Sequence, residues 1–164
     1  MRLYEFKIRA NLSGFPKDDV TGEVSLMASF VKTDISVSEA RNIVKERSFS
    51  FAVAVVNLYR LLTETKREFV MSKQLLRSGT ALGAMVREAE NAESKADFIH
   101  KLGIAQKECA ESIYWMDLLI ATNYLVITES GNLLGEAREI LNMLKSSIIT
   151  AKKNLANSRT IRDK

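Results

Sequence analysis

The chain has 164 residues, which is long enough for one domain with a single apolar core. Hydrophobic residues make up 46% and charged residues 27%, a balance typical of soluble globular proteins. No apolar run reaches the roughly 18 residues that a membrane-spanning helix needs, and charges interrupt the N-terminus where a signal peptide would be apolar, so we expect a cytoplasmic protein without a membrane partner. The formal net charge of +4 is compatible with a polyanion partner but does not identify one.

Residues 1–36 differ in composition from the rest of the chain. They hold Gly14 and the one proline, Pro16, between short apolar runs, and the weak alternation over residues 3–8 is compatible with a short strand. We expect an N-terminal arm that is flexible or weakly structured, or that packs on a neighbouring subunit. An alternative is that translation begins at Met27, in which case the residues before it are not part of the protein.

Residues 37–157 contain no proline and few glycines, and they predict helices rather than a turn-rich sheet. The first helix is expected to begin near Ser36 or Ser38, where Ser-Val-Ser-Glu matches a capping box, and to end within residues 63–66. The second is expected over residues 68–92. Its core candidates are apolar residues on one face: Phe69, Leu75, Leu76, Leu82, Met85, Val86 and Ala89.

The third helix is expected to begin after Ser94, a strong N-cap with Asp97 three residues later, and to stop at residues 122–123. The fourth is expected to start near residues 130–132 and to be followed by a polar tail, residues 158–164. Four helices with short connections predict an all-α fold, an antiparallel up-down-up-down four-helix bundle with an N-terminal arm.

A run of small residues in the second helix includes Gly79 and Gly83. Because a glycine inside a helix costs about 1 kcal/mol relative to alanine, two of them four residues apart require a reason. The spacing is best known from membrane helices, but Arg77 and Arg87 flank this pair. We therefore predict a close contact between helices of a soluble bundle.

The same region carries a family resemblance. The motifs QLLRSGT-x-x-GA, EA, SKADFI-x-KL-x-IA-x-KE and E-x-x-YW-x-x-LL follow one another from residue 74 to 119. In this order they resemble the bacterial four-helix-bundle proteins called 23S rRNA intervening-sequence proteins, over residues 42–153. The chain has Met85 where that family usually has asparagine, so the resemblance implies no polar role there.

The first and third helices carry more apolar surface than one bundle core needs, which favours a homo-oligomer. Large aromatic residues on these helices are candidates for the interface, because such residues are enriched in interface cores. The candidates are Phe51, Tyr59, Tyr114 and Trp115. The family resemblance implies a ring-shaped homopentamer, a number that the periodicity by itself does not give.

Catalytic and metal-binding patterns are incomplete. A di-iron bundle needs two Glu-x-x-His motifs. This chain has one histidine, His100, and the residue three positions before it is Asp97 rather than a glutamate. Cys109 is expected to be a buried apolar residue and has no histidine positioned as its base. Since no phosphate-binding loop or dinucleotide fingerprint occurs, we expect no cofactor and no enzyme activity.

The charged residues of the motif region admit two interpretations. Paired carboxylates three residues apart can do acid–base chemistry in a hydrolase. We favour a structural ion-pair network in which Arg77 binds a carboxylate across the second and third helices. The residues of that network are Arg77, Glu88, Glu108 and Glu111.

Two basic clusters are candidate nucleic-acid contacts. Lys66, Arg67 and Lys73 lie near the start of the second helix, and Lys152 and Lys153 lie near the end of the fourth. In an up-down bundle these clusters occupy opposite ends, so they form two patches rather than one.

The resemblance extends to accessory proteins of diversity-generating retroelements and implies association with RNA or DNA and with a reverse transcriptase. We therefore expect a non-catalytic, oligomeric accessory factor that binds nucleic acid or a ribonucleoprotein. The alternative is a structural scaffold that binds another protein through an apolar groove or a ring end.

Overall fold

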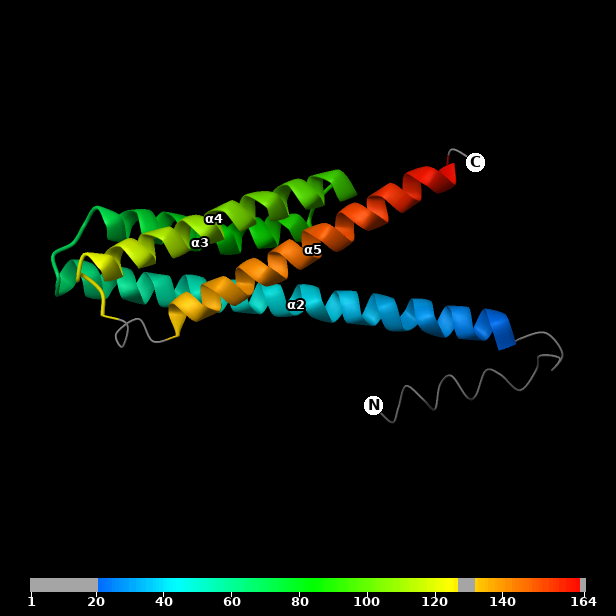
Figure 1. Ribbon diagram of the computed structural model, residues 1–164, viewed down its shortest axis with the longest axis horizontal. Helices are drawn as coiled ribbons and strands as arrows, with labels where there is room; N and C mark the ends of the chain where they lie inside the picture. The colour runs from blue at the N-terminus through cyan, green and yellow to red at the C-terminus, as the bar shows by residue number, and fades with distance from the viewer. Residues whose placement is uncertain (1–20, 127–131, 163–164) are drawn as a thin grey trace. The chain divides into compact units, whose positions relative to one another are not determined.

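The computed structural model describes residues 21–126 and 132–162, and this part of the chain is all-α, without a strand. Figure 1 shows its four helices. They are α2 (Thr21–Glu64), α3 (Met71–Glu90), α4 (Lys95–Ala121) and α5 (Leu133–Arg162). The chain divides into two compact units, residues 1–40 and 41–164, and the four-helix bundle is the second. The strand considered for residues 3–8 lies outside the described residues.

Two helix ends differ from the prediction. The first helix begins at Thr21 rather than near Ser36, so residues 21–36 of the predicted arm are helical. No proline or glycine follows Gly22 within this helix, and the serine–glutamate spacing is tolerated inside it. The fourth helix continues to Arg162, five residues beyond the predicted end at 157.

Other predicted boundaries are confirmed. The first helix ends at Glu64. The Ser94 hydroxyl accepts a hydrogen bond from the Asp97 N–H at 3.1 Å, which is the N-cap geometry that the sequence predicted. The chain leaves α4 through Asn123, whose φ of 62° is a left-handed conformation that asparagine tolerates well.

Contacts between α2 and α3 show that these helices run in opposite directions. Lys45 Nζ near the start of the bundle segment of α2 lies 2.8 Å from Glu90 Oε2 at the end of α3. Ten residues further along α2, Val55 lies against Gly79, eleven residues earlier in α3. The order of contacts is therefore reversed, as the up-down prediction requires.

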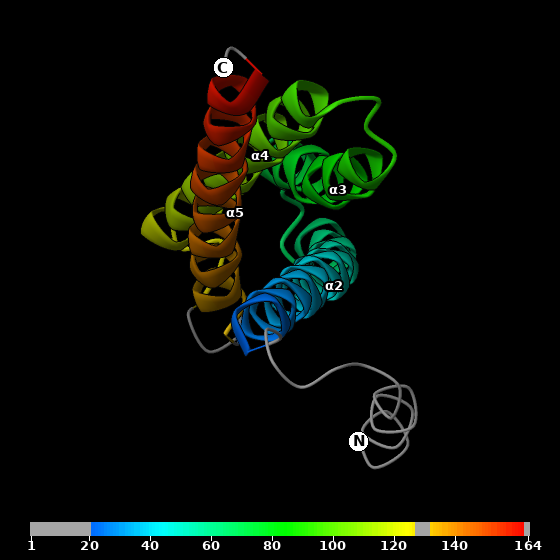
Figure 2. The same cartoon turned by 90° about the vertical axis from the view of Figure 1, so that its right-hand side faces the viewer.

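The same reversal holds between α3 and α4, where Ser78 meets Ser112 and Glu88 meets Lys101. Within residues 41–164, Figure 1 shows consecutive helices alternating in direction. The end-on view in Figure 2 shows them around a shared centre. None of the described helices has the length and apolarity that a bilayer crossing requires.

Two predictions about apolar residues, one near α3 and one in α2, are wrong. Phe69, a predicted core residue, is 53% exposed because it precedes the first turn of α3. Phe51, a predicted interface residue, is 2% exposed and belongs to the core of one chain, so it offers no surface to a second copy. Fully buried side chains come from all four helices, among them Val55, Leu62, Leu75, Leu82, Met116, Leu119, Ile140 and Leu144.

The close helix contact predicted from the glycines is confirmed. A Cβ built on Gly79 would lie 2.9 Å from both Cγ atoms of Val55, and one on Gly83 would lie 3.4 Å from the Ser48 carbonyl oxygen. Real Cβ atoms do not approach other atoms as closely as the first distance. Side-chain-free positions on α3 therefore allow α2 to pack hard against it.

Candidate functional site

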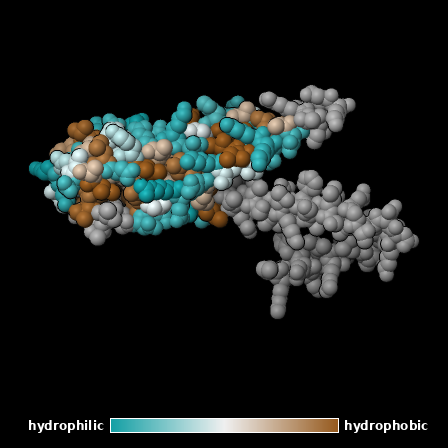
Figure 3. Space-filling view, in the orientation of Figure 1, coloured by the Kyte–Doolittle hydropathy of each residue, from teal (hydrophilic) through white to brown (hydrophobic). Residues whose placement is uncertain are grey.

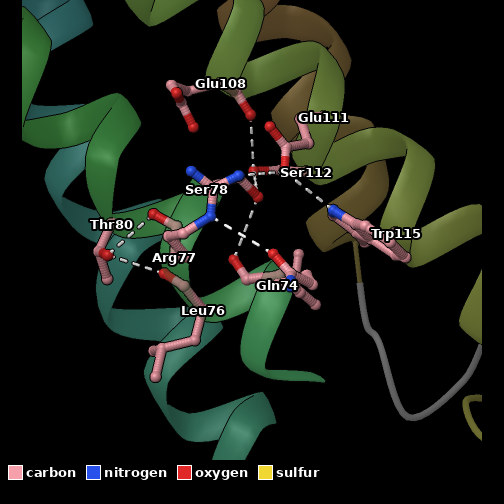
Figure 4. Close-up of polar contacts among 10 residues, drawn as sticks. Gln74, Leu76, Arg77, Ser78, Thr80, Glu108, Glu111, Ser112 and Trp115 are labelled. Atoms are coloured by element: carbon pink, nitrogen blue, oxygen red, sulfur yellow. Dashed lines mark hydrogen bonds and ion pairs between the residues drawn. The ribbon is translucent and has the colours of Figure 1, made fainter. Parts of the chain in front are cut away.

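A polar cluster joins the exposed edges of α3 and α4 (Figure 4). Arg77 Nη2 donates to Glu111 Oε1 at 2.6 Å, and the same oxygen accepts from Trp115 Nε1 at 3.1 Å. Gln74 Oε1 accepts a longer bond of 3.4 Å from Arg77 Nε. We call these four residues the Arg77 cluster. The predicted pairing of Arg77 with a carboxylate across the two helices is present.

The cluster is smaller than the predicted network. Glu88 lies 4.0 Å from Lys101 and not beside Arg77, because it is three turns further along α3. Within the described part of the chain, Glu108 Oε2 is buried and has no hydrogen-bond partner. Of the three predicted carboxylates, Glu111 is the one that binds Arg77.

A hydroxyl pair lies beneath the cluster. Ser112 Oγ and Ser78 Oγ are 2.9 Å apart, and both residues are fully buried. Each hydroxyl also lies near a carbonyl of its own helix, Glu108 O at 2.9 Å and Leu75 O at 3.4 Å. The pair pins the register of α3 against α4. The sequence analysis did not identify this pair, because an antiparallel register is needed to bring residue 112 opposite residue 78.

Cys109 and His100 were the side chains considered for nucleophilic or metal chemistry. Burial raises the pKa of Cys109 to about 12, and its Sγ lies 3.2 Å from the Ala137 carbonyl oxygen, so this thiol is not a thiolate at neutral pH. His100 is exposed on α4. Over residues 21–126 and 132–162, no group of histidine, cysteine and carboxylate side chains could hold a metal ion.

The first basic patch, Lys66, Arg67 and Lys73, lies exposed where α2 turns into α3. Arg67 has φ of 55°, in the left-handed region that disfavours residues with a Cβ. Among the described residues, its guanidinium forms no ion pair. The patch therefore includes an arginine at a position where the backbone itself would prefer glycine or asparagine.

Glu68 follows Arg67 in sequence but does not neutralise the patch at the surface. Its carboxylate accepts hydrogen bonds from the backbone N–H groups of Val70, Met71 and Ser72 at 2.7–2.9 Å. Burial by itself would raise the pKa of Glu68, but these hydrogen bonds outweigh it and lower the pKa below its usual value. Glu68 thus caps α3 from inside, although the sequence placed it as the first helical residue.

The second basic patch, Lys152 and Lys153, lies exposed in the last turns of α5. Lys95 Nζ lies 3.3 Å from Ser158 Oγ, which sets this end of α5 beside the start of α4. The α2–α3 turn is at the other end of the bundle (Figure 1). The two patches are therefore separate, as predicted.

Several large apolar side chains remain exposed. Tyr114 on α4 is 57% exposed, and its ring meets Trp115 edge-on with 5.0 Å between centroids. Tyr59 and Trp115 are half-buried. The turns at one end expose another set, and Figure 3 shows apolar patches there among the hydrophilic surface. We call this set the apolar end: Phe69, Val70, Tyr124 and Val126.

Comparison with known proteins identifies the family to which the chain belongs. The sequence profile of the 23S rRNA-intervening sequence protein family matches residues 40–146, which include the bundle segment of α2, all of α3 and α4, and half of α5. The chain belongs to this family. The match confirms the resemblance drawn from the motifs, and it includes the first basic patch but not the second.

A solved structure from the S23 ribosomal protein family agrees with the assignment. It is a protein of unknown function from Bacteroides thetaiotaomicron, 50% identical in sequence, with a TM-score of 0.65. The similarity covers 66% of this chain and 97% of that one. No curated protein matches the sequence. The family and its four-helix fold are thus shown, and the chemistry rests on the residues of this chain.

Proposed function

We propose that this member of the 23S rRNA-intervening sequence protein family is a non-catalytic, oligomeric accessory factor of the cytoplasm that binds nucleic acid or a ribonucleoprotein. The contact surface is the first basic patch, formed by Lys66, Arg67 and Lys73. This patch lies inside the family match, whereas Lys152 and Lys153 lie beyond it. The second patch is a supplementary contact.

The backbone at Arg67 carries the proposal. A left-handed conformation costs a residue with a Cβ about 1 kcal/mol, and glycine avoids that cost. An exposed arginine without an ion pair in the described chain does not recover it by internal contacts. The side chain is therefore explained best by an anionic partner outside the chain, and phosphate is one of the two groups, with carboxylate, that a guanidinium binds through two hydrogen bonds.

Assembly makes a small patch effective. Each protomer presents the patch once, and a ring of five, the number that the family resemblance implies, repeats it around one axis. Affinity for a phosphate backbone rises with the number of counterions released, so repetition multiplies a weak contact. Structured RNA is the first probe, since the family is named for an intervening sequence of 23S rRNA. A reverse transcriptase is the protein partner to test beside it.

The experiment is a gel-shift titration with structured RNA and duplex DNA at several salt concentrations. Reversing Lys66, Arg67 and Lys73 to glutamate should abolish the shift at moderate salt. Lys145→Glu, an exposed charge in the middle of α5, is the matched control and should bind almost normally. Unchanged binding by the triple variant, or equal loss in the control, would count against the proposal.

Arg67→Gly separates binding from folding. Relief of the left-handed strain should stabilise the fold by about 1 kcal/mol, while loss of the guanidinium should weaken RNA binding and lower the salt dependence. Effects of opposite sign cannot come from general damage to the protein. A variant that is more stable and binds RNA as tightly as the wild type would refute the role of Arg67.

The absence of catalysis is part of the proposal. Glu111, the better placed of the two carboxylates, is occupied by Arg77 and Trp115. If the protein is instead a hydrolase, the double variant Glu108→Gln/Glu111→Gln should lose its activity. Full function in that variant would remove the hydrolase interpretation.

A second candidate function is a scaffold for another protein, and the apolar end favours it. Phe69 and Val70 are 53% and 74% exposed, well beyond ordinary scattered exposure for such residues. Binding through this surface should be insensitive to salt and should be lost in Phe69→Ser/Val70→Ser. RNA binding by that variant would then identify the basic patch as the operative surface.

A further inference from the structure

The turn between α2 and α3 presents an aromatic ring beside the first basic patch. Phe69 is 53% exposed, and it follows Arg67 by two residues and precedes Lys73 by four. Two residues of chain span at most about 7 Å, so the phenyl ring and the guanidinium leave the backbone from neighbouring points. The basic patch and the nearest part of the apolar end are therefore one continuous surface.

The buried residue Glu68 fixes the backbone from which this ring projects. Its carboxylate holds the first turn of α3, and its N–H donates to the Leu62 carbonyl oxygen at the end of α2, at 3.1 Å. Ser72 Oγ donates to the Glu68 carbonyl oxygen at 2.7 Å. Because hydrogen bonds join the residue before Phe69 to both helices, little backbone entropy remains to be lost when a flat partner stacks on the ring.

The same hydrogen bonds decide how an anion can bind here. The N–H groups at the start of α3 already donate to Glu68, so an anion at this turn has to bind side chains rather than the helix N-terminus. Over residues 64–73, Glu64 is the one exposed carboxylate, since Glu68 is buried. Three exposed cations outnumber it, namely Lys66, Arg67 and Lys73. The surface around the ring is therefore basic.

A second exposed phenylalanine shows what sets Phe69 apart. Phe49 on α2 is exposed to a similar extent, 54%, but the guanidinium of Arg87 lies over its ring at 5.2 Å from the centroid. Within residues 21–126 and 132–162, no aromatic ring or cation lies against Phe69. The face of the Phe69 ring is thus open to a flat group from another molecule.

A nucleotide supplies both of the groups that this surface would bind. Its base is flat and stacks on aromatic side chains, and its phosphate binds the cations beside them, which is how proteins hold single strands. In a duplex each base face is covered by its neighbours, whereas unpaired bases can turn out to stack. An apolar protein surface over Phe69 would instead have to remove water from the adjacent cations without pairing them.

We propose that Phe69 stacks on an unpaired base while Arg67 binds an adjacent phosphate, so that the α2–α3 turn selects single-stranded over duplex nucleic acid. Lys66 and Lys73 add phosphate contacts along the strand. The inference rests on the proposed function and narrows its ligand to an unpaired segment, such as a loop or a free end of an RNA.

Binding of two RNA probes tests the stacking. One is an unstructured oligonucleotide of about eight nucleotides, a length that one single-strand site holds, and the other is a blunt duplex. Phe69→Leu keeps an apolar side chain but not the ring, and it should weaken oligonucleotide binding about tenfold, the contribution of one stacked base. It should leave duplex binding unchanged. Phe69→Tyr should bind both probes like the wild type.

Phe49→Leu is the matched control, since this ring is equally exposed but lies 15 residues before the end of α2 and already contacts Arg87. It should change the binding of neither probe. A Phe69→Leu variant that binds the oligonucleotide as tightly as the wild type does, or that loses affinity equally for both probes, would overturn the stacking.

Photo-cross-linking identifies the ring directly. An oligonucleotide that carries 5-iodouridine becomes bonded on irradiation to an aromatic side chain against which the base lies. Mass spectrometry of the digested complex should find the label on Phe69. A label on Tyr114 or Trp115, which lie on α4, would contradict the inference.

The two probes also separate this inference from the proposed function. If the Lys66, Arg67 and Lys73 reversal abolishes binding of both probes but Phe69→Leu changes neither, the basic patch is kept and the stacking is removed. If the wild type binds neither probe, the proposed function and the stacking both fail.

Discussion

Gly79 and Gly103 each lie in the interior of a long helix, Gly79 between Ser78 and Thr80 and Gly103 between Leu102 and Ile104. Their surroundings differ completely. Gly79 lies under Val55, and its missing side chain lets α2 and α3 approach, whereas Gly103 faces open space. The first glycine is explained by a close contact inside the chain, whereas no described neighbour restricts the side chain at the second.

This difference separates two kinds of position for small residues. Inside the bundle they set the distance between two helices, and any added atom strains the core. At an open position such as Gly103, an added atom meets no described neighbour and does not strain the core. Substitutions at the two glycines should therefore differ in their effect on stability.

The largest effect is expected at the inner glycine. Gly79→Leu should destabilise the bundle by about 3 kcal/mol or more, because the new side chain overlaps Val55 and the helices must separate. Gly103→Leu should leave the stability of the dilute monomer unchanged or raised by up to about 1 kcal/mol, since leucine favours helix more than glycine does. Urea denaturation at low protein concentration measures both.

A compensating change controls for general damage at this site. Gly79→Ala/Val55→Ala should recover stability relative to Gly79→Ala, because removing the two Cγ atoms makes room for the new Cβ. If Gly79→Leu folds with wild-type stability, α2 and α3 are not packed at this distance, and the comparison between the two glycines fails.

The sequence predicted the contact at Gly79 for a physical reason. Two glycines four residues apart share a helix face and indicate that another helix approaches closely there. The Ser94 cap was equally local and was predicted. Glu68 was not recognised as a cap because its three bonds need a turn that the sequence does not specify.

Contacts between residues far apart in sequence could likewise be predicted only in part. Arg77 was predicted to bind a carboxylate across helices, but choosing Glu111 over Glu108 requires the register that Ser78 and Ser112 establish. Phe51 and Phe49 lie two residues apart, and the sequence alone does not distinguish their surroundings. The angle at which α2 faces its neighbours buries the first and exposes the second.

The next largest loss of stability is expected when Glu68, the buried cap of α3, is replaced. Glu68→Gln should destabilise the bundle by about 2 kcal/mol at pH 7. The neutral amide has one acceptor oxygen, whereas the charged carboxylate accepts three backbone N–H bonds through two oxygens. Chemical denaturation at pH 7 measures this loss. Ser94→Ala, at an exposed cap, should cost only about 1 kcal/mol.

The pH dependence of this cap has a definite sign. The folded protein lowers the pKa of Glu68, so its contribution is present above the pKa of the unfolded chain, about 4.3, and is lost as the pH falls through the lower folded value. The stability difference between the wild type and Glu68→Gln should therefore shrink below about pH 4. A difference that grows on acidification would contradict the assignment of the carboxylate as the cap.

A half-buried ion pair between α2 and α5 is expected to matter less. Arg47 binds Glu136 through Nε and Nη2, at 3.2 and 2.7 Å, and also binds Glu139. Hydrogen bonds to these carboxylates raise the pKa of Arg47, so it stays charged throughout. Arg47→Met should cost about 1–2 kcal/mol and should increase amide exchange in the first turns of α5. Arg47→Lys, which keeps the charge but not the fork, should recover part of the loss.

The smallest effect is expected at the outer ion pair of the Arg77 cluster. The Arg77 side chain is 59% exposed, and an ion pair at such a surface is worth roughly 0–1 kcal/mol. Arg77→Met removes the charge and keeps the aliphatic length, and Glu111 still accepts from Trp115 Nε1. Denaturation in low and high salt should show a loss below about 1 kcal/mol that fades as salt screens the pair. A loss as large as that of Arg47→Met would mean that the α3–α4 edge is held by charge, whereas the buried hydroxyls of Ser78 and Ser112 already account for its register.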